Sequence, residues 1–151
     1  MGFVLSRLLR LAALSVFAHA ACGDGSSSEP PASPVRLSAT VYGDGEAAGY
    51  LRLLPEGEPL VEWAPRDVIV VRDAPLDVSI VAALLSAGPQ SGASHLTLRL
   101  KEKSIPNASV PTIYSSAQLA QWNGKLVYLR AEKGAIEISL ITLAEAERVW
   151  S

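Results

Sequence analysis

The chain contains a single cysteine, Cys22, and no cysteine follows it. One thiol cannot form an intramolecular disulfide, and a chain without further cysteines has no cysteine-rich zinc site. Whatever folds after Cys22 must therefore be held together by the packing of apolar side chains. Hydrophobic residues make up 49% of the 151 residues, which is enough for one core.

The first 21 residues have the pattern of an export signal. Arg7 and Arg10 make the start basic, and an apolar run broken only by Ser15 covers residues 11–18. This run is far shorter than the roughly 20 residues that a membrane-spanning helix needs. A basic start, a short apolar centre and small residues at the end are typical of a signal peptide that is removed after export.

Ala20, Ala21 and Cys22 end this segment, and residues rich in Gly, Ser and Pro follow. Over about its first 30 residues the chain resembles bacterial lipoprotein precursors, whose signal ends in small and aliphatic residues before an invariant cysteine. The resemblance implies that the Cys22 thiol receives a diacylglycerol, that the leader is cut before Cys22 and that the new amino group is acylated. His19 departs from the pattern, because an aliphatic residue normally stands there.

Two alternatives to this processing stay open. Ala18-His19-Ala20 fits the small-x-small site of an ordinary signal peptidase, which would release a soluble protein starting at Ala21. Met1-Gly2 with Ser6 matches the N-myristoylation pattern, although export explains the apolar run behind it better. Lipid attachment is physically effective, since each buried methylene contributes about 0.8 kcal/mol and two or three chains hold a protein at a bilayer.

The residues after the cysteine bear on location and on domain boundaries. In lipoproteins of enteric bacteria an Asp directly after the cysteine retains the protein in the inner membrane, whereas here Gly23 follows and Asp24 comes second. The resemblance therefore favours the outer membrane, with the protein facing the periplasm. We expect a signal peptide over residues 1–21, a lipidated flexible tether over residues 22–34 and a single β-rich domain over residues 35–151.

The charge of the mature part argues against a nucleic-acid partner. Removal of the leader takes away two arginines, which leaves 11 basic and 15 acidic residues and a net charge near −4. The mature part has no basic block, so the positive surface expected of a nucleic-acid-binding protein is absent from the sequence.

The first half of the expected domain contains several strand patterns. Residues 35–42 alternate apolar and polar side chains, residues 48–54 form a return strand, and the turn at residues 43–46 joins them as a hairpin. A short strand is expected at residues 60–63, and the β-branched run at residues 67–72 predicts a central strand.

The middle of the chain is less regular. Residues 77–87 combine β-branched residues with Ala82-Ala83-Leu84-Leu85, and we favour a helix capped by Asp77 or Ser79 and ended by Gly88. Residues 88–94 predict a loop. Residues 95–101 alternate leucines with polar residues, which predicts a strand with one wet face.

The last third of the chain predicts a loop, a helix, a hairpin and a final helical turn. Residues 105–114 contain two prolines and predict an extended loop, after which Ser115 or Ser116 caps a short helix through Trp122. A hairpin joins residues 126–131 to residues 135–143, and Thr142 begins a capping box. The sum is an α+β fold, mostly antiparallel β, as a small sheet or OB-like barrel with one or two short helices.

Few residues in this domain carry recognisable chemistry. His95 is the one histidine after the leader, and without neighbouring cysteines or carboxylates it predicts a surface position and no metal site. The sequence shows no nucleophile elbow and no phosphate-binding glycine loop. Asn107-Ala108-Ser109 fits the glycosylation pattern, which we take as incidental in a bacterial envelope protein. We therefore expect no catalytic residue, no metal and no cofactor.

The three tryptophans are the candidates for a partner surface. Trp63, Trp122 and Trp150 lie near the ends of expected elements, where aromatic side chains serve either as interface anchors or as core packing. We expect a membrane-tethered lipoprotein with a non-enzymatic binding or accessory role in assembly or secretion, and its partners would be the membrane and another envelope protein. The alternatives are a periplasmic ligand-binding or inhibitor/immunity module and, more remotely, a small hydrolase built on His95.

Overall fold

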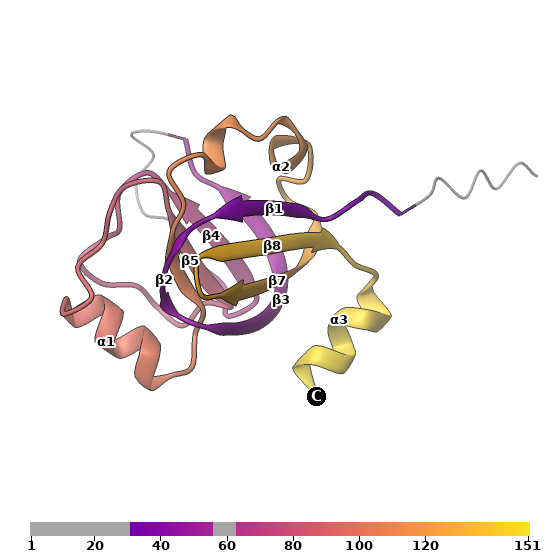
Figure 1. The fold of residues 1–151 in the computed structure, drawn as a ribbon. Helices are drawn as coiled ribbons and strands as arrows, with labels where there is room; N and C mark the ends of the chain where they lie inside the picture. The colour runs from indigo at the N-terminus through magenta and orange to yellow at the C-terminus, as the bar shows by residue number, and fades with distance from the viewer. Residues whose placement is uncertain (1–30, 56–62) are drawn as a thin grey trace, which may run out of the picture.

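The computed structural model describes residues 31–55 and 63–151, and these form one eight-stranded mixed sheet with three short α-helices and a 3₁₀ turn (Figure 1). The strands are β1 (Val35–Ser38), β2 (Thr40–Gly43), β3 (Gly45–Leu53), β4 (Asp67–Val71), β5 (Ala83–Ser86), β6 (Asn107–Ser109), β7 (Leu126–Glu132) and β8 (Ala135–Leu140). The helical elements are α1 (His95–Glu102), η1 (Ile113–Ser115), α2 (Ala117–Gln121) and α3 (Leu143–Trp150). Cys22, the expected signal peptide, most of the expected tether and the first three residues of the strand expected at 60–63 lie outside the described residues.

The strand order is β1-β8-β7-β3-β4-β5-β6-β2. The four central strands β3, β4, β5 and β6 run parallel, and antiparallel pairs flank them on both sides. The fold is therefore a sheet-rich α+β arrangement with mixed strands, whereas we expected a mostly antiparallel sheet. The sheet is not closed, so the OB-like barrel is not confirmed.

The expected N-terminal hairpin is wrong. Residues 35–43 form two short strands that bend at Ala39, with β1 paired to β8 and β2 paired to β6 at the other end of the sheet. A single residue, Asp44, separates β2 from β3, which is too short for the tightest hairpin loop. The chain therefore runs on into β3, and Gly45, at φ 140°, makes this bend with a conformation that favours glycine.

The central strand at residues 67–72 is confirmed, and the helix expected next to it is wrong. Strand β4 is buried over its whole length between β3 and β5. The Ala-Leu-Leu run that favoured a helix is β5, which is also completely buried, between β4 and β6. A parallel strand covered on both faces is apolar at every position, so its sequence cannot be distinguished from that of a buried helix.

The strand expected at residues 95–101 is also wrong, because this segment is helix α1. Leu96 and Leu100 are buried, whereas Leu98 is 49% exposed. Residues four apart share a face in both a helix and a strand, so only Leu98 separates the two interpretations. The Ser94 hydroxyl caps the helix by accepting a hydrogen bond from the Thr97 N–H at 3.1 Å.

The C-terminal third follows the sequence closely. Ser116 caps α2, and β7 and β8 form the expected hairpin with Gly134 at φ 85°. Thr142 and Glu145 complete the capping box that begins α3. The segment expected as an extended loop at residues 105–114 adds one correction, because it contains β6 and the first part of η1.

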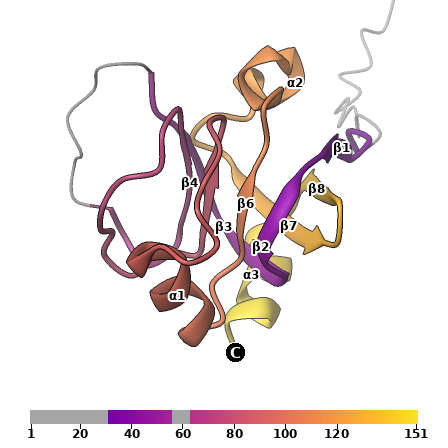
Figure 2. The same ribbon diagram turned by 60° about the vertical axis from the view of Figure 1, so that its left-hand side comes forward.

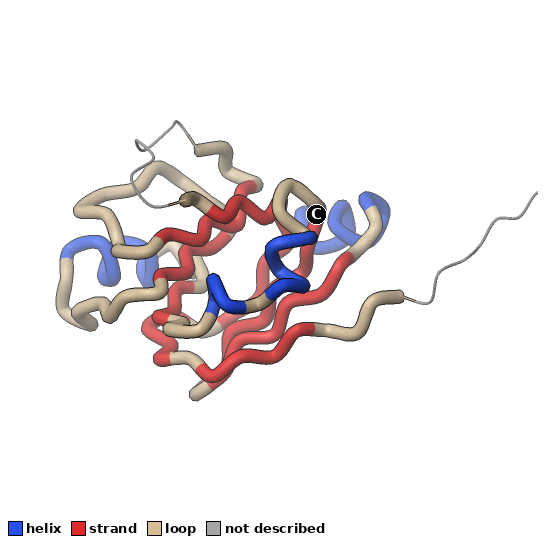
Figure 3. Tube along the Cα trace, turned by 90° about the horizontal axis from the view of Figure 1, so that it is seen from above, coloured by secondary structure: helices blue, strands red, loops and turns tan. Residues whose placement is uncertain are grey.

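Apolar side chains gather on both faces of the sheet. The main core lies on the face covered by η1 and α2, where Ile113, Leu119 and Trp122 pack against the sheet. A second core lies on the other face, where Leu96 and Leu100 of α1 pack near β4 and β5. Figure 2 shows α2 at one end of the molecule, and Figures 1 and 3 place α1 and α3 toward opposite sides of the curved sheet. The second core therefore fixes α1 beside the ends of the parallel strands.

Candidate functional site at the ends of the parallel strands

The carboxyl ends of β4, β5 and β6 lie at one edge of the sheet, where ligands bind in many sheets with parallel strands. Two serines end the strands there, Ser86 in β5 and Ser109 in β6, and both are buried. Their hydroxyl groups donate to the same acceptor, the Gly88 carbonyl, at 2.8 and 2.9 Å. The loop that leaves β5 is thus held to two strands.

Gln90 continues this network along the same loop. Its Nε2 donates to the Ser86 hydroxyl at 2.8 Å and to the Ala108 carbonyl at 3.3 Å. Because a carbonyl only accepts, these bonds fix which end of the amide faces the sheet. The other end, Oε1, is buried, and no hydrogen-bond donor in the described part of the chain reaches it.

Tyr42 ties the loop to the edge strand β2. Its hydroxyl donates to the Gln90 carbonyl at 2.8 Å and accepts from the Gln90 N–H at 3.2 Å. A residue 48 positions earlier in the chain therefore supports the loop, which the sequence did not indicate.

A hollow of about 290 Å³ opens beside this network, between the loops that follow β4 and β5 and the start of α1. Its lining residues are Asp73, Ala74, Pro75, Leu76, Pro89, Gln90, Ser91, Ser94, His95 and Leu96. The lack of a side chain at Gly88 leaves room for Asp73, because an added Cβ would lie 2.7 Å from Asp73 Oδ1. Leu76 is 95% exposed, the largest exposure among the large apolar side chains of the described chain.

His95, expected on the surface of a strand, is exposed at the start of α1 and lines this hollow. Asp73, Ser91 and Ser94 share the hollow with it, but within residues 31–55 and 63–151 no hydrogen bond joins His95 to any of them. The Ser94 hydroxyl donates instead to Thr97 Oγ1 at 2.8 Å. A nucleophile paired with a base is therefore not assembled here. The described residues also contain no group of three His, Cys, Asp or Glu side chains placed to hold a metal.

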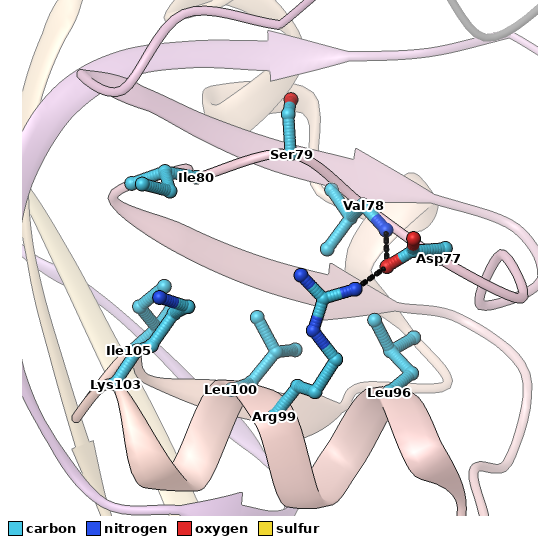
Figure 4. A pocket seen from close by; sticks show the side chains of 9 residues that line it. All are labelled: Asp77, Val78, Ser79, Ile80, Leu96, Arg99, Leu100, Lys103 and Ile105. Atoms are coloured by element: carbon cyan, nitrogen blue, oxygen red, sulfur yellow. Dashed lines mark hydrogen bonds and ion pairs between the residues drawn. The ribbon is translucent and has the colours of Figure 1, made fainter.

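A second cavity lies farther along α1 and is much smaller, about 20 Å³ (Figure 4). Asp77 closes it by an ion pair with Arg99, and the same carboxylate accepts from the Val78 N–H at 2.9 Å. A space of this size holds about one water molecule. Its role is structural, because the ion pair fastens the loop before β5 to the helix.

A wider hollow, about 560 Å³, lies where the described chain enters the sheet. Pro31 and Ala32 line it together with Gln121 and Trp122. The Gln118 Nε2 donates to the Ser33 carbonyl at 2.9 Å, so the end of the expected tether rests against α2. The described part of the tether, residues 31–34, is exposed and has no regular structure.

The three candidate interface tryptophans occupy different environments. Trp122 is 3% exposed and belongs to the main core, so it offers little surface to a partner. Trp63 is partly buried against the second core, and its Nε1 has no hydrogen-bond partner among the residues that the structure describes. Trp150 donates from Nε1 to the Ala48 carbonyl at 2.8 Å, and Arg66 stacks 3.9 Å above its ring. Trp150 thus anchors α3 to β3.

Asn107 is 1% exposed within β6, and within residues 31–55 and 63–151 neither polar atom of its amide has a hydrogen-bond partner. A side chain buried to this extent in a strand is not accessible for glycosylation of the folded protein. The glycosylation pattern at this position is therefore incidental, as the sequence suggested.

Comparisons with known proteins identify no family. No family model matches the chain, and no curated protein matches it either. A solution NMR structure of a UPF0107 protein is similar in part, with a TM-score of 0.48 and 11% identity over 72% of this chain and the whole of that chain. In the described part of the chain no helix has the length and apolarity needed to cross a membrane.

Sequence reasoning missed Asp73 and Gln90, the polar residues that shape the hollow. Gln90 lies in the predicted loop at residues 88–94 and Asp73 in a short stretch to which no element was assigned, and local composition alone does not say which loops meet. The available signal was the pair of β-branched or aliphatic runs that became β4 and β5. Parallel pairing of these runs would have placed both loops at one edge of the sheet.

Proposed function

We propose that this protein is a lipoprotein, anchored through Cys22 to a bacterial envelope membrane, whose domain has a non-enzymatic binding role in assembly or secretion. The anchor is supported by the first 30 residues, and the outer membrane is favoured because Asp24 is not directly after the cysteine. The described chain leaves the sheet at residues 31–34, on the side away from α1 (Figure 1). This position gives the hollow beside α1 free access to a partner.

The hollow at the ends of β4 and β5 is the observation that carries the binding role. The loop that leaves β5 is held by hydrogen bonds from Ser86, Ser109 and Tyr42, so this wall of the hollow is rigid before a partner arrives. Rigid loops lower the entropy lost on association. The same polar groups bond backbone carbonyls and each other and do not activate a nucleophile, which favours binding over hydrolysis.

A periplasmic ligand-binding module without a membrane anchor is the second candidate. The size of the hollow favours it, because about 290 Å³ lies near the lower end of the range of small-molecule sites. In that case, cleavage after Ala20 would leave Cys22 unmodified.

The anchor is tested with the variant Cys22→Ser. We expect wild-type protein in the membrane fraction, with a mass increased by acyl chains, and the variant in the soluble fraction without them. His19→Leu is the matched control, because it restores the aliphatic residue of lipoprotein signals and should raise the acylated fraction. Soluble wild-type protein that begins at Ala21 would contradict the anchor.

The binding role is tested by site-specific photo-crosslinking in whole cells. A photoreactive side chain at Leu76, on the rim of the hollow, should give a discrete cross-linked product. The same side chain at Glu137 of β8, whose side chain is 43% exposed, serves as the control and should give none. Equal products from both positions, or none from Leu76, would refute the role of the hollow in binding.

A further inference from the structure

We propose that Tyr50, Arg66, Val149 and Trp150 form a second interaction surface, the Arg66 surface, which binds an acidic segment of a partner protein. This surface is separate from the hollow, because α1 and α3 lie toward opposite sides of the curved sheet (Figures 1 and 3). Three properties carry the proposal: the contacts that join its residues, the unpaired charge of Arg66, and the exposed aromatic and apolar groups around that charge.

Three segments of the chain meet at the Arg66 surface. The Tyr50 N–H, in β3, donates to the Arg66 carbonyl at 2.8 Å, so the turn before β4 lies beside β3. The Arg66 guanidinium stacks 3.9 Å above the ring of Trp150 in α3. The Trp150 Nε1 in turn donates to the Ala48 carbonyl of β3 at 2.8 Å. These contacts hold the guanidinium and the ring in place before any partner binds.

Arg66 has no anionic partner in the described chain. Several other arginines pair with carboxylates there, namely Arg36, Arg52, Arg99 and Arg130. Over residues 31–55 and 63–151, neither an ion pair nor a hydrogen bond uses the Arg66 guanidinium. Stacking on an aromatic ring uses the flat face of a guanidinium and leaves the N–H donors at its edge available. A carboxylate accepts two parallel N–H bonds from such an edge, so Arg66 is suited to an Asp or Glu side chain.

The groups beside Arg66 favour a protein over a lipid as the acidic partner. Tyr50 and Val149 belong to the large apolar side chains that remain exposed, and Trp150 is only partly buried. Trp, Tyr and Arg are enriched among the residues that contribute most to binding at protein interfaces. Attraction to anionic lipids takes clusters of about four to eight Lys and Arg residues, whereas this surface contains one. A segment with acidic and apolar side chains therefore matches the Arg66 surface better than a lipid headgroup does.

The test is a pair of titrations of the ¹⁵N-labelled full-length protein, followed by NMR. The probes are the peptide amides acetyl-Leu-Glu-Leu-Glu-Leu and acetyl-Leu-Gln-Leu-Gln-Leu, which share their apolar side chains and differ in charge. We expect the acidic peptide to shift the indole N–H signal of Trp150 and the amide signals of Tyr50 and Val149. It should bind about tenfold more tightly than the neutral peptide. Equal affinities, or shifts confined to other parts of the protein, would overturn the proposal.

Substitutions of Arg66 locate the charge that is responsible. Arg66→Gln should weaken the acidic peptide about tenfold and leave the neutral peptide unchanged, since it removes the cation. Arg66→Lys keeps the charge without the two parallel donors, so it should recover only part of the affinity. Arg36→Gln removes an exposed arginine from β1 and, as the control, should change neither affinity. An Arg66→Gln protein that keeps its Trp150 indole signal and binds the acidic peptide as wild type does would refute the assignment.

Cross-linking in whole cells distinguishes this surface from the hollow. A photoreactive side chain at Val149 should give a discrete product that is lost in Arg66→Gln, whereas the product from Leu76 should persist. Vesicles of phosphatidylglycerol, mixed with the Cys22→Ser protein, test the lipid alternative. Vesicle binding that disappears in Arg66→Gln, without a product from Val149, would identify a lipid surface and overturn a protein partner. Absence of the Val149 product contradicts the Arg66 surface alone, and absence of the Leu76 product contradicts the hollow alone.

Discussion

Gly49 lies in β3 where this strand meets the start of β4, and replacing it by alanine tests the packing of the parallel strands. A Cβ at this position would lie 2.3 Å from the Arg66 carbonyl oxygen and 3.1 Å from the Ala82 Cβ. The carbonyl cannot simply move, because it accepts a hydrogen bond from the Tyr50 N–H at 2.8 Å. Gly49→Ala must therefore displace the backbone at the start of β4.

The magnitude follows from two contributions. Forcing an extra carbon into a packed site costs about 1–3 kcal/mol. Loss of the Tyr50 hydrogen bond to Arg66 adds about 1 kcal/mol. We expect Gly49→Ala to lower the free energy of unfolding by about 3 kcal/mol, which corresponds to a fall in Tm of about 10 °C for a domain of this size.

The assay is urea unfolding of wild type and variant, followed by far-UV circular dichroism. Gly92→Ala is the matched control, because the contact its Cβ makes, 3.8 Å from Tyr42 Cδ1, is an ordinary one. This control should be neutral or stabilising by up to about 1 kcal/mol, since alanine restricts the unfolded chain. If Gly49→Ala unfolds within about 0.5 kcal/mol of wild type, the close approach of β3 to Arg66 is wrong.

Three further predictions concern the core and two ionisable groups. Trp122→Ala should cost about 3–5 kcal/mol in urea unfolding, because it empties the main core; a loss below about 1 kcal/mol would contradict its burial. Hydrogen bonds from the Thr142 N–H and hydroxyl hold the pKa of Glu145 below its ordinary value of 4.5, so the cap stabilises α3 above that pH and is lost as the pH falls through the lowered pKa. Glu145→Gln should remove this acid dependence from the NMR shift of the Thr142 amide, and an unchanged dependence would refute the cap. Burial, together with a hydrogen bond to Glu46, raises the pKa of Tyr128 to about 12, so the folded state retains this proton and stability falls as the pH rises above about 10. Absorbance at 295 nm should show one tyrosine ionising near pH 12 that is missing in Tyr128→Phe, and no difference between the two titrations would count against the raised pKa.

Local signals predicted the C-terminal third of the fold well. The glycine at position 134, the serine at position 116 and the Thr142–Glu145 capping box each act within a few residues, so their effect is readable from sequence. The same applies to β4, whose β-branched run suits a buried strand in any sheet.

The wrong predictions concern segments whose local sequence is compatible with both a helix and a strand. The apolar run of β5 suits a buried helix as well as a buried strand, and its neighbours β4 and β6 decide between them. Leu96 and Leu100 of α1 are four residues apart and would share a face in a helix and in a strand alike. Packing against the second core therefore decides that this segment is a helix. The candidate site depends on these same elements, and its residues were missed together with them.

The sequence by itself predicted the export signal and determined the turns and caps, because each of these features depends on neighbouring residues. Tertiary structure alone decided that β3 to β6 run parallel and that residues 35–43 bend at Ala39 to reach both ends of the sheet. Pairings between distant segments are set by which buried surfaces fit, and no local pattern encodes them. The hollow that joins Asp73, Gln90 and His95 exists because of those pairings, and it was therefore visible only in the folded molecule.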